Sequence, residues 1–265
     1  MSIYLDEKNP GKHKPFEDAS PDVVAYVRYL EVIAGKSANT AFSYYCDLRG
    51  FSRFMKRRRG LVPADCEMKD IDPKGLDAAF WASVTKEDIY EYLYFLGSEC
   101  GNKKSSTARR LASLHGFYDY LVNQVNKLEA DPTAAIHPPK QDKVLPKYLT
   151  AEQSMDLLES TQFQSDFPER DYCMVVLFLN CGMRLAELVG MDLEDIDLEN
   201  RQIRLFGKGH KERMVYLNDA CMEALQLYLN KRNTMEGLLP KERAVFITRR
   251  RKERISNRRV EQLIT

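Results

Sequence analysis

The feature that most constrains the fold is a proline-rich stretch near the middle of the chain. Between residues 130 and 147 lie four prolines: Pro132, Pro138, Pro139 and Pro146. Proline lacks a backbone donor and has a fixed φ, so this stretch is typical of a linker between domains. The chain of 265 residues is long enough for two hydrophobic cores. We predict a flexible N-terminus over 1–20, a first domain over 21–129, a linker over 130–147 and a second domain over 148–265.

The first domain carries four helical patterns. Apolar residues recur at helical spacing over 21–34, 37–59, 85–100 and 105–125. Helix starts are indicated by Ser20, Ser37 and Thr85, because short polar side chains accept hydrogen bonds from the first backbone N–H groups of a helix. Residues 61–80 contain two prolines and a mixed pattern, which we interpret as a long connection. The sequence therefore predicts an all-helical first domain built on four helices.

The second domain begins with helices. Thr150 and Gln153 form a capping-box pattern, and the nearly unbroken apolar run over 172–179 is typical of a helix buried in a core. We expect further helices after Asn218 and after Ser256, and a short strand over 244–248.

A hairpin is predicted between these helices. Apolar and polar residues alternate over 203–206 and again over 213–217, on either side of Gly207-Lys208-Gly209. Lys208 would then be exposed on a flexible tip, where the backbone can closely approach a ligand. The fold class that follows is mainly α, with an α+β second domain that contains a small antiparallel sheet.

Arg184 is the second candidate for ligand binding. Gly182 permits a turn after the buried helix, and Arg184 follows at the start of a short helix that ends at Gly190. A guanidinium in this position suits an anion, and together with Lys208 it suggests phosphate. For Arg184 alone, a structural ion pair with Asp192 or Asp195 is the simpler interpretation.

Charge is distributed unevenly along the chain. The formal net charge is only +1, with a pI near 7.6, which argues against a simple nucleic-acid-binding domain. Basic residues nevertheless form two blocks, over 49–59 and over 249–259. Such blocks are usually solvated faces, but two of them beside a phosphate-type motif favour nucleic acid.

Other features limit location and chemistry. The six cysteines form no Cys-x-x-Cys pair, and the first residues have no apolar signal core, so we expect a reducing cytoplasm. We expect no membrane-spanning segment and no cofactor. We also expect no metal site, because the four histidines lie far apart in the sequence and have no carboxylates at ligand spacing.

The residues CGMRLAEL, DID and IRLFGKGHKERMVYL resemble the catalytic domain of the tyrosine recombinases, the Xer and phage-integrase family. The resemblance implies that Arg184 clamps the scissile phosphate and that Lys208 is the general acid for the leaving 5′ oxygen. Glu187 matches an acidic position that supports the arginine, although it could equally be a solvated charge. Double-stranded DNA and further recombinase protomers are the implied partners, with no role for a membrane.

Two stretches of the first domain also resemble this family. NTAFSYYCDLRGF and TARRLASLHGFYDYLV are similar to the second and fourth helices of its core-binding (SAM-like) domain, of which the second lies against DNA. Arg109 and Arg110, at the start of the fourth, could enter a major groove or contact phosphates. We expect Arg109 and Arg110 to lie outside the hydrophobic stripe of their helix. Tyr44 could instead be a core aromatic. The residues expected to contact DNA are Thr40, Tyr44, Arg49, Arg53, Arg109 and Arg110. We expect the four arginines to contact DNA rather than acids of their own domain.

The chain departs from the family pattern in one respect. The family continues with a His-x-x-Arg box and the tyrosine that attacks the phosphate, and neither follows in order before Thr265. His210 and Arg213 have the spacing of such a box. They lie at the hairpin, however, and the family has its box later in the sequence, so we interpret the match as coincidence. Tyr216 and Tyr228 also precede the expected position. We therefore regard the catalytic domain as C-terminally incomplete and expect this chain to bind DNA without cleaving it.

Two other function classes stay open. One is a non-catalytic DNA-binding factor on a recombinase scaffold, which the gene sequence beyond Thr265 would distinguish. The other is a helical protein-interaction module with solvated basic faces, which a test of duplex binding would distinguish.

Overall fold

The computed structural model describes residues 16, 18–63, 65–138, 148–163, 165–207 and 212–264. The chain forms two compact units, Met1–Val144 and Leu145–Thr265. Their boundary lies within residues 130–147, and much of that stretch falls outside the described residues. No helix among the described residues is both long enough and apolar enough to cross a membrane.

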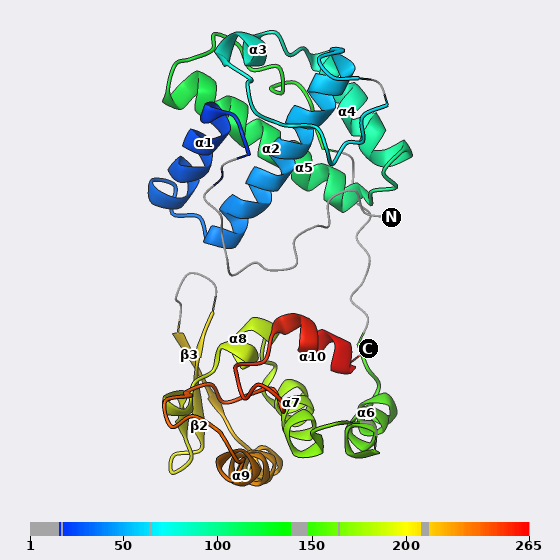
Figure 1. The fold of residues 1–265 in the computed structure, drawn as a ribbon. Helices are drawn as coiled ribbons and strands as arrows, with labels where there is room; N and C mark the ends of the chain where they lie inside the picture. Colours follow the sequence, from blue (N-terminus) through cyan, green and yellow to red (C-terminus); the bar gives the residue numbers. More distant parts are fainter. Residues whose placement is uncertain are drawn as a thin grey trace. The chain divides into compact units, whose positions relative to one another are not determined.

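The first unit is helical (Figure 1). Its elements are α1 (Pro21–Val32), α2 (Ala38–Arg58), α3 (Ala78–Ala82), α4 (Lys86–Ser98), α5 (Lys104–Asp119) and the π-helix η1 (Tyr120–Gln124). The four long helices are the four that the sequence predicts. Helix α1 packs on α2, and α5 packs on both α2 and α4. Their apolar faces enclose one core that includes Leu48, Phe51, Tyr92 and Phe117.

Local signals set the starts of α2 and α4 as predicted, whereas Ser20, the expected cap of α1, makes no side-chain cap hydrogen bond. The Ser37 hydroxyl accepts a hydrogen bond from the N–H of Thr40 at 3.3 Å. Thr85 and Asp88 form a reciprocal capping box at the start of α4. Helix α1 ends at Val32, before Gly35, whose positive φ closes the terminal turn.

The predicted connection over 61–80 contains one element that the pattern did not indicate. The side chain of Asp77 caps the short helix α3 by accepting the N–H of Phe80 at 2.8 Å. This helix places Trp81 in the core, with its ring 5.0 Å from that of Phe117 and with no exposed surface. The tryptophan anchors the long connection to the helices.

The second unit combines helices with a three-stranded antiparallel sheet (Figure 1). In chain order its elements are α6 (Ala151–Phe163), α7 (Pro168–Cys181), α8 (Leu185–Gly190), the 3₁₀ helix η2 (Leu193–Asp195), β1 (Ile196–Asp197), β2 (Gln202–Phe206), β3 (Glu212–Tyr216), α9 (Asp219–Asn233) and α10 (Asn257–Ile264). The predicted hairpin is β2–β3, with Ile203 opposite Val215. The predicted fold class is therefore confirmed, with β1 as an additional short strand.

The predicted strand over 244–248 is wrong. Its residues make only isolated bridges, Asp192 with Ala244 and Ile247 with Arg254. Arginine side chains donate to backbone carbonyls that would otherwise accept hydrogen bonds from a neighbouring strand. Arg232 donates to the carbonyls of Ala244 and Val245, and Arg170 donates to the carbonyl of Ile247. Both arginines are about 2% exposed, so this segment is held from the core side rather than by a neighbouring strand.

Tyr228 belongs to this internal support. Its hydroxyl donates to the carbonyl of Val245 at 2.9 Å and accepts the N–H of Ile247 at 3.2 Å, and the residue has no exposed surface. Burial raises the pKa of Tyr228 above its ordinary value. A phenol in this position holds the backbone and cannot reach a phosphate in solution.

We expect Tyr228→Phe to destabilise the second unit by about 1–3 kcal/mol, because it leaves the buried N–H of Ile247 without its acceptor and removes one of the two side-chain donors to the carbonyl of Val245. Urea unfolding followed by far-UV circular dichroism measures the change. Tyr216, which is 75% exposed on β3, supplies the matched control. Tyr216→Phe should shift stability by less than ~0.5 kcal/mol. Equal shifts for the two variants would contradict the structural role of Tyr228.

Candidate phosphate-binding site

A left-handed turn places Arg184 at the surface. Helix α7 ends at Cys181, and Gly182 follows with φ 55° and ψ 39°, a conformation that glycine adopts without steric cost. Arg184 is then the extended N-cap residue of α8. Its side chain is 73% exposed, so its guanidinium is accessible to a ligand.

Glu187 holds both the backbone N–H and the guanidinium of Arg184. One carboxylate oxygen accepts the backbone N–H of Arg184 and the other accepts its Nη1, each at 2.8 Å. The Glu187 side chain is only 2% exposed. Of the two interpretations left open by the sequence, a solvated charge is therefore wrong. That Glu187 supports a functional arginine stays a prediction.

Arg213 also reaches this carboxylate. It lies on β3, and its Nη2 donates to Glu187 at 2.7 Å and to the carbonyl of Gly182 at 3.1 Å. The sequence reasoning missed this residue, because it treated the His210 to Arg213 spelling as coincidence. Strand alternation could have indicated it, since Arg213 shares a face with the buried Val215.

The electrostatics of the cluster favour an ionised carboxylate. Burial alone would raise the pKa of Glu187, but hydrogen bonds from Arg213 and from the backbone and side chain of Arg184 outweigh it and lower the pKa to about 2. In turn, the Glu187 carboxylate raises the pKa of Arg213. Two guanidiniums thus share one carboxylate, and the cluster keeps one net positive charge. Such a cluster attracts an anion.

The acids proposed as structural partners of Arg184 are used elsewhere. Asp192 pairs with Arg254, and Asp195 pairs with Arg204 at 3.2 Å. Lys208 lies outside the described residues, which include both strands of its hairpin but not the tip. The structure therefore describes Arg184 and Glu187 of the predicted site, with Arg213 in addition.

In the first unit, Arg109 and Arg110 both pair with an acid. Asp47 of α2 is buried and forms ion pairs with Arg109 and with Arg110, the latter at 3.5 Å. Burial raises the pKa of Asp47, and the two arginines offset part of that effect. Arg110 is 8% exposed, so the prediction that it lies outside the apolar stripe of its helix is wrong. The side chain of Arg109 is 45% exposed.

The other candidates of this unit also have internal contacts. Arg49 pairs with Asp18 at 2.9 Å, and Arg53 donates to the carbonyl of Ile71 at 2.9 Å. The expectation that the arginines avoid acids of their own domain is thus wrong for Arg49, Arg109 and Arg110. Arg109 and Arg110 face the buried Asp47, and Arg49 reaches Asp18, whose side chain is partly exposed.

Thr40 and Tyr44 are half-buried on α2. The hydroxyl of Thr40 is 2.9 Å from that of Ser37, and Tyr44 packs against the core. Each keeps part of its surface exposed, so contact with a ligand stays a prediction.

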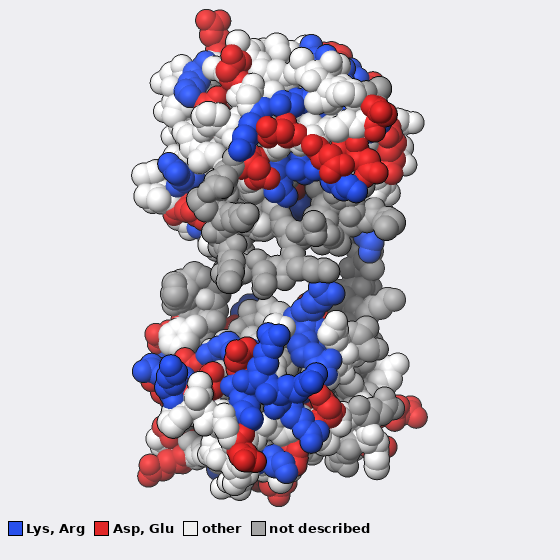
Figure 2. Space-filling view, in the orientation of Figure 1, with Lys and Arg blue, Asp and Glu red and all other residues white. Residues whose placement is uncertain are grey.

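The surface charge differs between the two units (Figure 2). Acidic and basic side chains are interleaved on the visible face of the first unit, whereas blue side chains gather on the second. In the block over 249–259, Arg250, Arg251 and Arg258 are exposed and have no hydrogen-bond or ion-pair partner in the described part of the chain. This block is therefore the freer of the two basic stretches.

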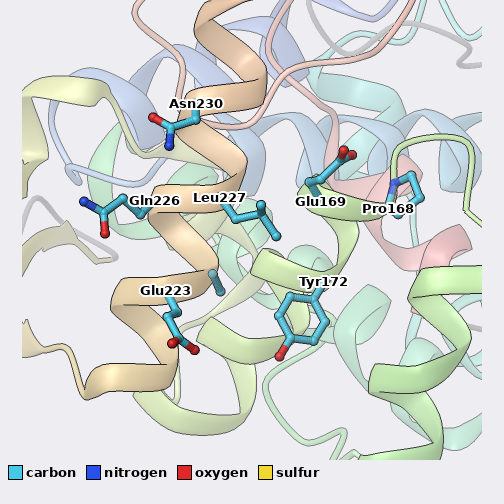
Figure 3. A pocket seen from close by; sticks show the side chains of 8 residues that line it. Pro168, Glu169, Tyr172, Glu223, Gln226, Leu227 and Asn230 are labelled. Carbon is cyan, nitrogen blue, oxygen red and sulfur yellow. The ribbon is translucent and has the colours of Figure 1, made fainter.

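A pocket between α7 and α9 does not suit phosphate (Figure 3). It is lined by Pro168, Glu169, Tyr172, Glu223, Ala224, Gln226, Leu227 and Asn230. Two of these are carboxylates, which repel an anion. Its α7 residues are in the first turns, whereas Arg184 follows the last turn, roughly 20 Å further along a helix of this length.

We expect the stability of the second unit to depend on Glu187 and on pH. The pKa of Glu187 is about 2 in the folded chain against an ordinary 4.5, so its stabilisation is present above about pH 4.5 and is lost as the pH falls through about 2. Glu187→Gln should therefore cost up to about 3 kcal/mol near neutral pH and progressively less below pH 4.5. Urea unfolding by circular dichroism from pH 7 to pH 2.5 measures both proteins.

The lone tryptophan, Trp81, lies in the first unit, so its fluorescence is an internal control that should not respond to Glu187→Gln. A stability difference that is independent of pH would contradict the low pKa.

The chain is similar to known proteins in sequence and in fold. Residues 147–265 match the family model described as the phage integrase family. A tyrosine recombinase XerC from Caldanaerobacter subterraneus subsp. tengcongensis is 39% identical over 92% of this chain and 67% of its own length. A XerC from Chlamydia pneumoniae is 30% identical over 91% of this chain and 76% of its own length.

Solved structures agree in fold. A crystal structure of a lambda integrase dimer bound to a COC′ core site matches with a TM-score of 0.60 and 19% identity, over 92% of this chain and 75% of that one. The Tn1549 transposon integrase in complex with circular intermediate DNA matches with a TM-score of 0.55 and 18% identity, over 89% and 73%. The chain spans about two thirds of the XerC sequence from Caldanaerobacter. From the extent of these sequence matches, the chain belongs to the tyrosine recombinase family.

Proposed function

We propose that this chain binds duplex DNA and serves site-specific recombination, with Arg184 on the phosphate at which a strand is cut and rejoined. The observation that carries the proposal is the exposed guanidinium of Arg184, held by a buried carboxylate that is itself fixed by Arg213. An arginine whose guanidinium is held on one side by a carboxylate, with its other donors exposed, is suited to clamp a phosphate.

The chemistry needs positive donors around the reacting phosphate. Transfer without a metal requires donors on the phosphate oxygens, an acid for the leaving oxygen and a placed nucleophile. Arg184 would supply the first, and Lys208 at the hairpin tip would supply the second. In this family the cut strand is held as a 3′-phosphotyrosine, and we extend that intermediate to the reaction that this chain serves.

Neither Tyr216 nor Tyr228 is suited to the attack. Tyr228 is buried and bonded to the backbone, and Tyr216 lies on β3, ahead of the place that the family pattern gives to the nucleophile. We infer that residues 1–265 hold DNA without forming the covalent bond. This also leaves a DNA-binding factor without catalysis as the second candidate function.

The two units would share the DNA. We propose that both contact the same duplex as a clamp, the second through the basic block over 249–259 and the first through α2 and α5. Thr40, Tyr44, Arg49, Arg53 and Arg109 are the proposed contacts of the first unit. Arg109 is half-exposed and can exchange Asp47 for a phosphate, whereas Arg110 would hold Asp47 from the inside.

Related proteins support the proposed partners. The matching lambda integrase structures contain a dimer on a core site and a tetramer on a Holliday junction. We propose that other protomers likewise join this chain on paired DNA sites. Its six free cysteines support a reducing, cytoplasmic location.

We expect duplex binding to fall steeply with salt, because contacts to phosphate release counterions. With roughly six phosphate contacts, the slope of log affinity against log salt should be about −5. Fluorescence anisotropy with a labelled duplex of about 30 base pairs measures it, and Arg184→Ala should make the slope shallower by about 1. A flat salt dependence would instead favour a protein-interaction module.

We expect residues 1–265 to form no covalent adduct with DNA. A pool of nicked duplexes of varied sequence, with binding verified on a native gel, should give no protein–DNA band on a denaturing gel. The physical reason is that losing the nucleophile removes the covalent route, whereas losing one donor only slows it by about 100- to 1000-fold. A band that Tyr216→Phe abolishes would overturn the assignment of the tyrosines.

A further inference from the structure

We propose that Arg213 is a positioning residue that holds Arg184 for the phosphate and couples it to strand β3. This inference rests on the proposed role of Arg184 in DNA binding. It assigns a function to the arginine of the His210–Arg213 stretch, which the sequence alone left without one.

Arg184 depends on a single side chain for its position. A long, 73% exposed arginine has many rotamers, and ordering it is costly in conformational entropy. Its side-chain bond to Glu187 selects one direction, and the bond from its backbone N–H to the same carboxylate fixes the base. The place of Arg184 is therefore set by where Glu187 lies.

Glu187, in turn, depends on Arg213. The oxygen that accepts the Arg184 N–H also accepts Nη2 of Arg213 at 2.7 Å. A buried carboxylate with too few donors is costly, so removing one guanidinium forces Glu187 to shift, to take up a proton or to draw Arg184 inward. Each of these responses disturbs Arg184.

The same nitrogen of Arg213 also fixes the turn. It donates to the carbonyl of Gly182 at 3.1 Å, two residues before Arg184. Met183 lies between them and is 6% exposed, which anchors the turn in the core. Arg213 thus holds the segment that leads into Arg184 as well as the carboxylate that follows it.

Arg213 is at the same time part of the hairpin. It pairs with Leu205 of β2, whose side chain is 1% exposed, and it lies one residue after the start of β3. A displacement of β3 would therefore be transmitted to Glu187 and to the turn before Arg184.

A double-mutant cycle on DNA affinity tests the coupling. Arg184→Ala, Arg213→Ala and the double variant are compared with the wild type by fluorescence anisotropy on one labelled duplex at fixed salt. We expect Arg184→Ala to weaken binding about tenfold and Arg213→Ala about fivefold. The double variant should be about tenfold weaker and not about fiftyfold, because Arg213 acts through Arg184.

Arg204 is the matched control. It lies on β2 of the same hairpin, its side chain is 43% exposed against 39% for Arg213, and its carboxylate partner is Asp195 rather than Glu187. Arg204→Ala should leave affinity within about twofold, and any effect should add to that of Arg184→Ala. Arg213→Lys should bind DNA more tightly than Arg213→Ala, because one ammonium can replace the single nitrogen that makes both contacts. If Arg213→Ala does not fold, Arg213→Lys and Arg213→Gln take its place in the cycle.

Additive losses in the double variant would overturn the inference, since they would mean that Arg213 contacts DNA itself or acts only on stability. No loss in Arg184→Ala would overturn the proposed phosphate role and the inference with it. The two failures are distinguished by the Arg184→Ala measurement alone.

Discussion

The site depends on one buried carboxylate. Removing the charge of Glu187 from water is unfavourable unless donors replace the lost hydration, and here three come from two arginines on separate elements. This requirement brings the turn after α7, the start of α8 and strand β3 to one point. The exposed tip of Arg184 is a consequence, because the carboxylate holds one end of the guanidinium and leaves the rest free. A site built in this way can present a cation without burying it.

The first unit uses buried acids in the same way. Asp88 caps α4 and accepts bonds from Arg58 and Arg59 at the end of α2, at 2.8 and 2.6 Å. Asp47 joins α2 to the arginines of α5. The basic residues that a charge pattern indicates for DNA therefore also connect helices. Half-exposed members such as Arg109 can serve both purposes, whereas a buried member such as Arg110 serves the fold.

Local chemistry made much of this predictable from sequence. The caps at Ser37 and Thr85, the left-handed Gly182 and the alternation of the hairpin each depend on residues a few positions apart. The parts that sequence reasoning missed depend on distant partners. Arg109 lies 62 positions from Asp47 in the sequence, and Arg213 lies 26 positions from Glu187. Arg170 lies 77 positions from Ile247, whose carbonyl it occupies in place of a neighbouring strand. No periodic pattern in the sequence indicates such pairs, because they form only when the helices and strands pack together.

The central claim is that two arginines keep Glu187 ionised inside the second unit. Carbon-13 NMR of the glutamate side-chain carboxyls measures this directly, with the Glu187 signal assigned as the one missing from Glu187→Gln. The shared carboxylate predicts a titration midpoint near pH 2. A midpoint at the ordinary 4.5 would contradict the account, because it would mean that neither guanidinium holds the carboxylate in solution.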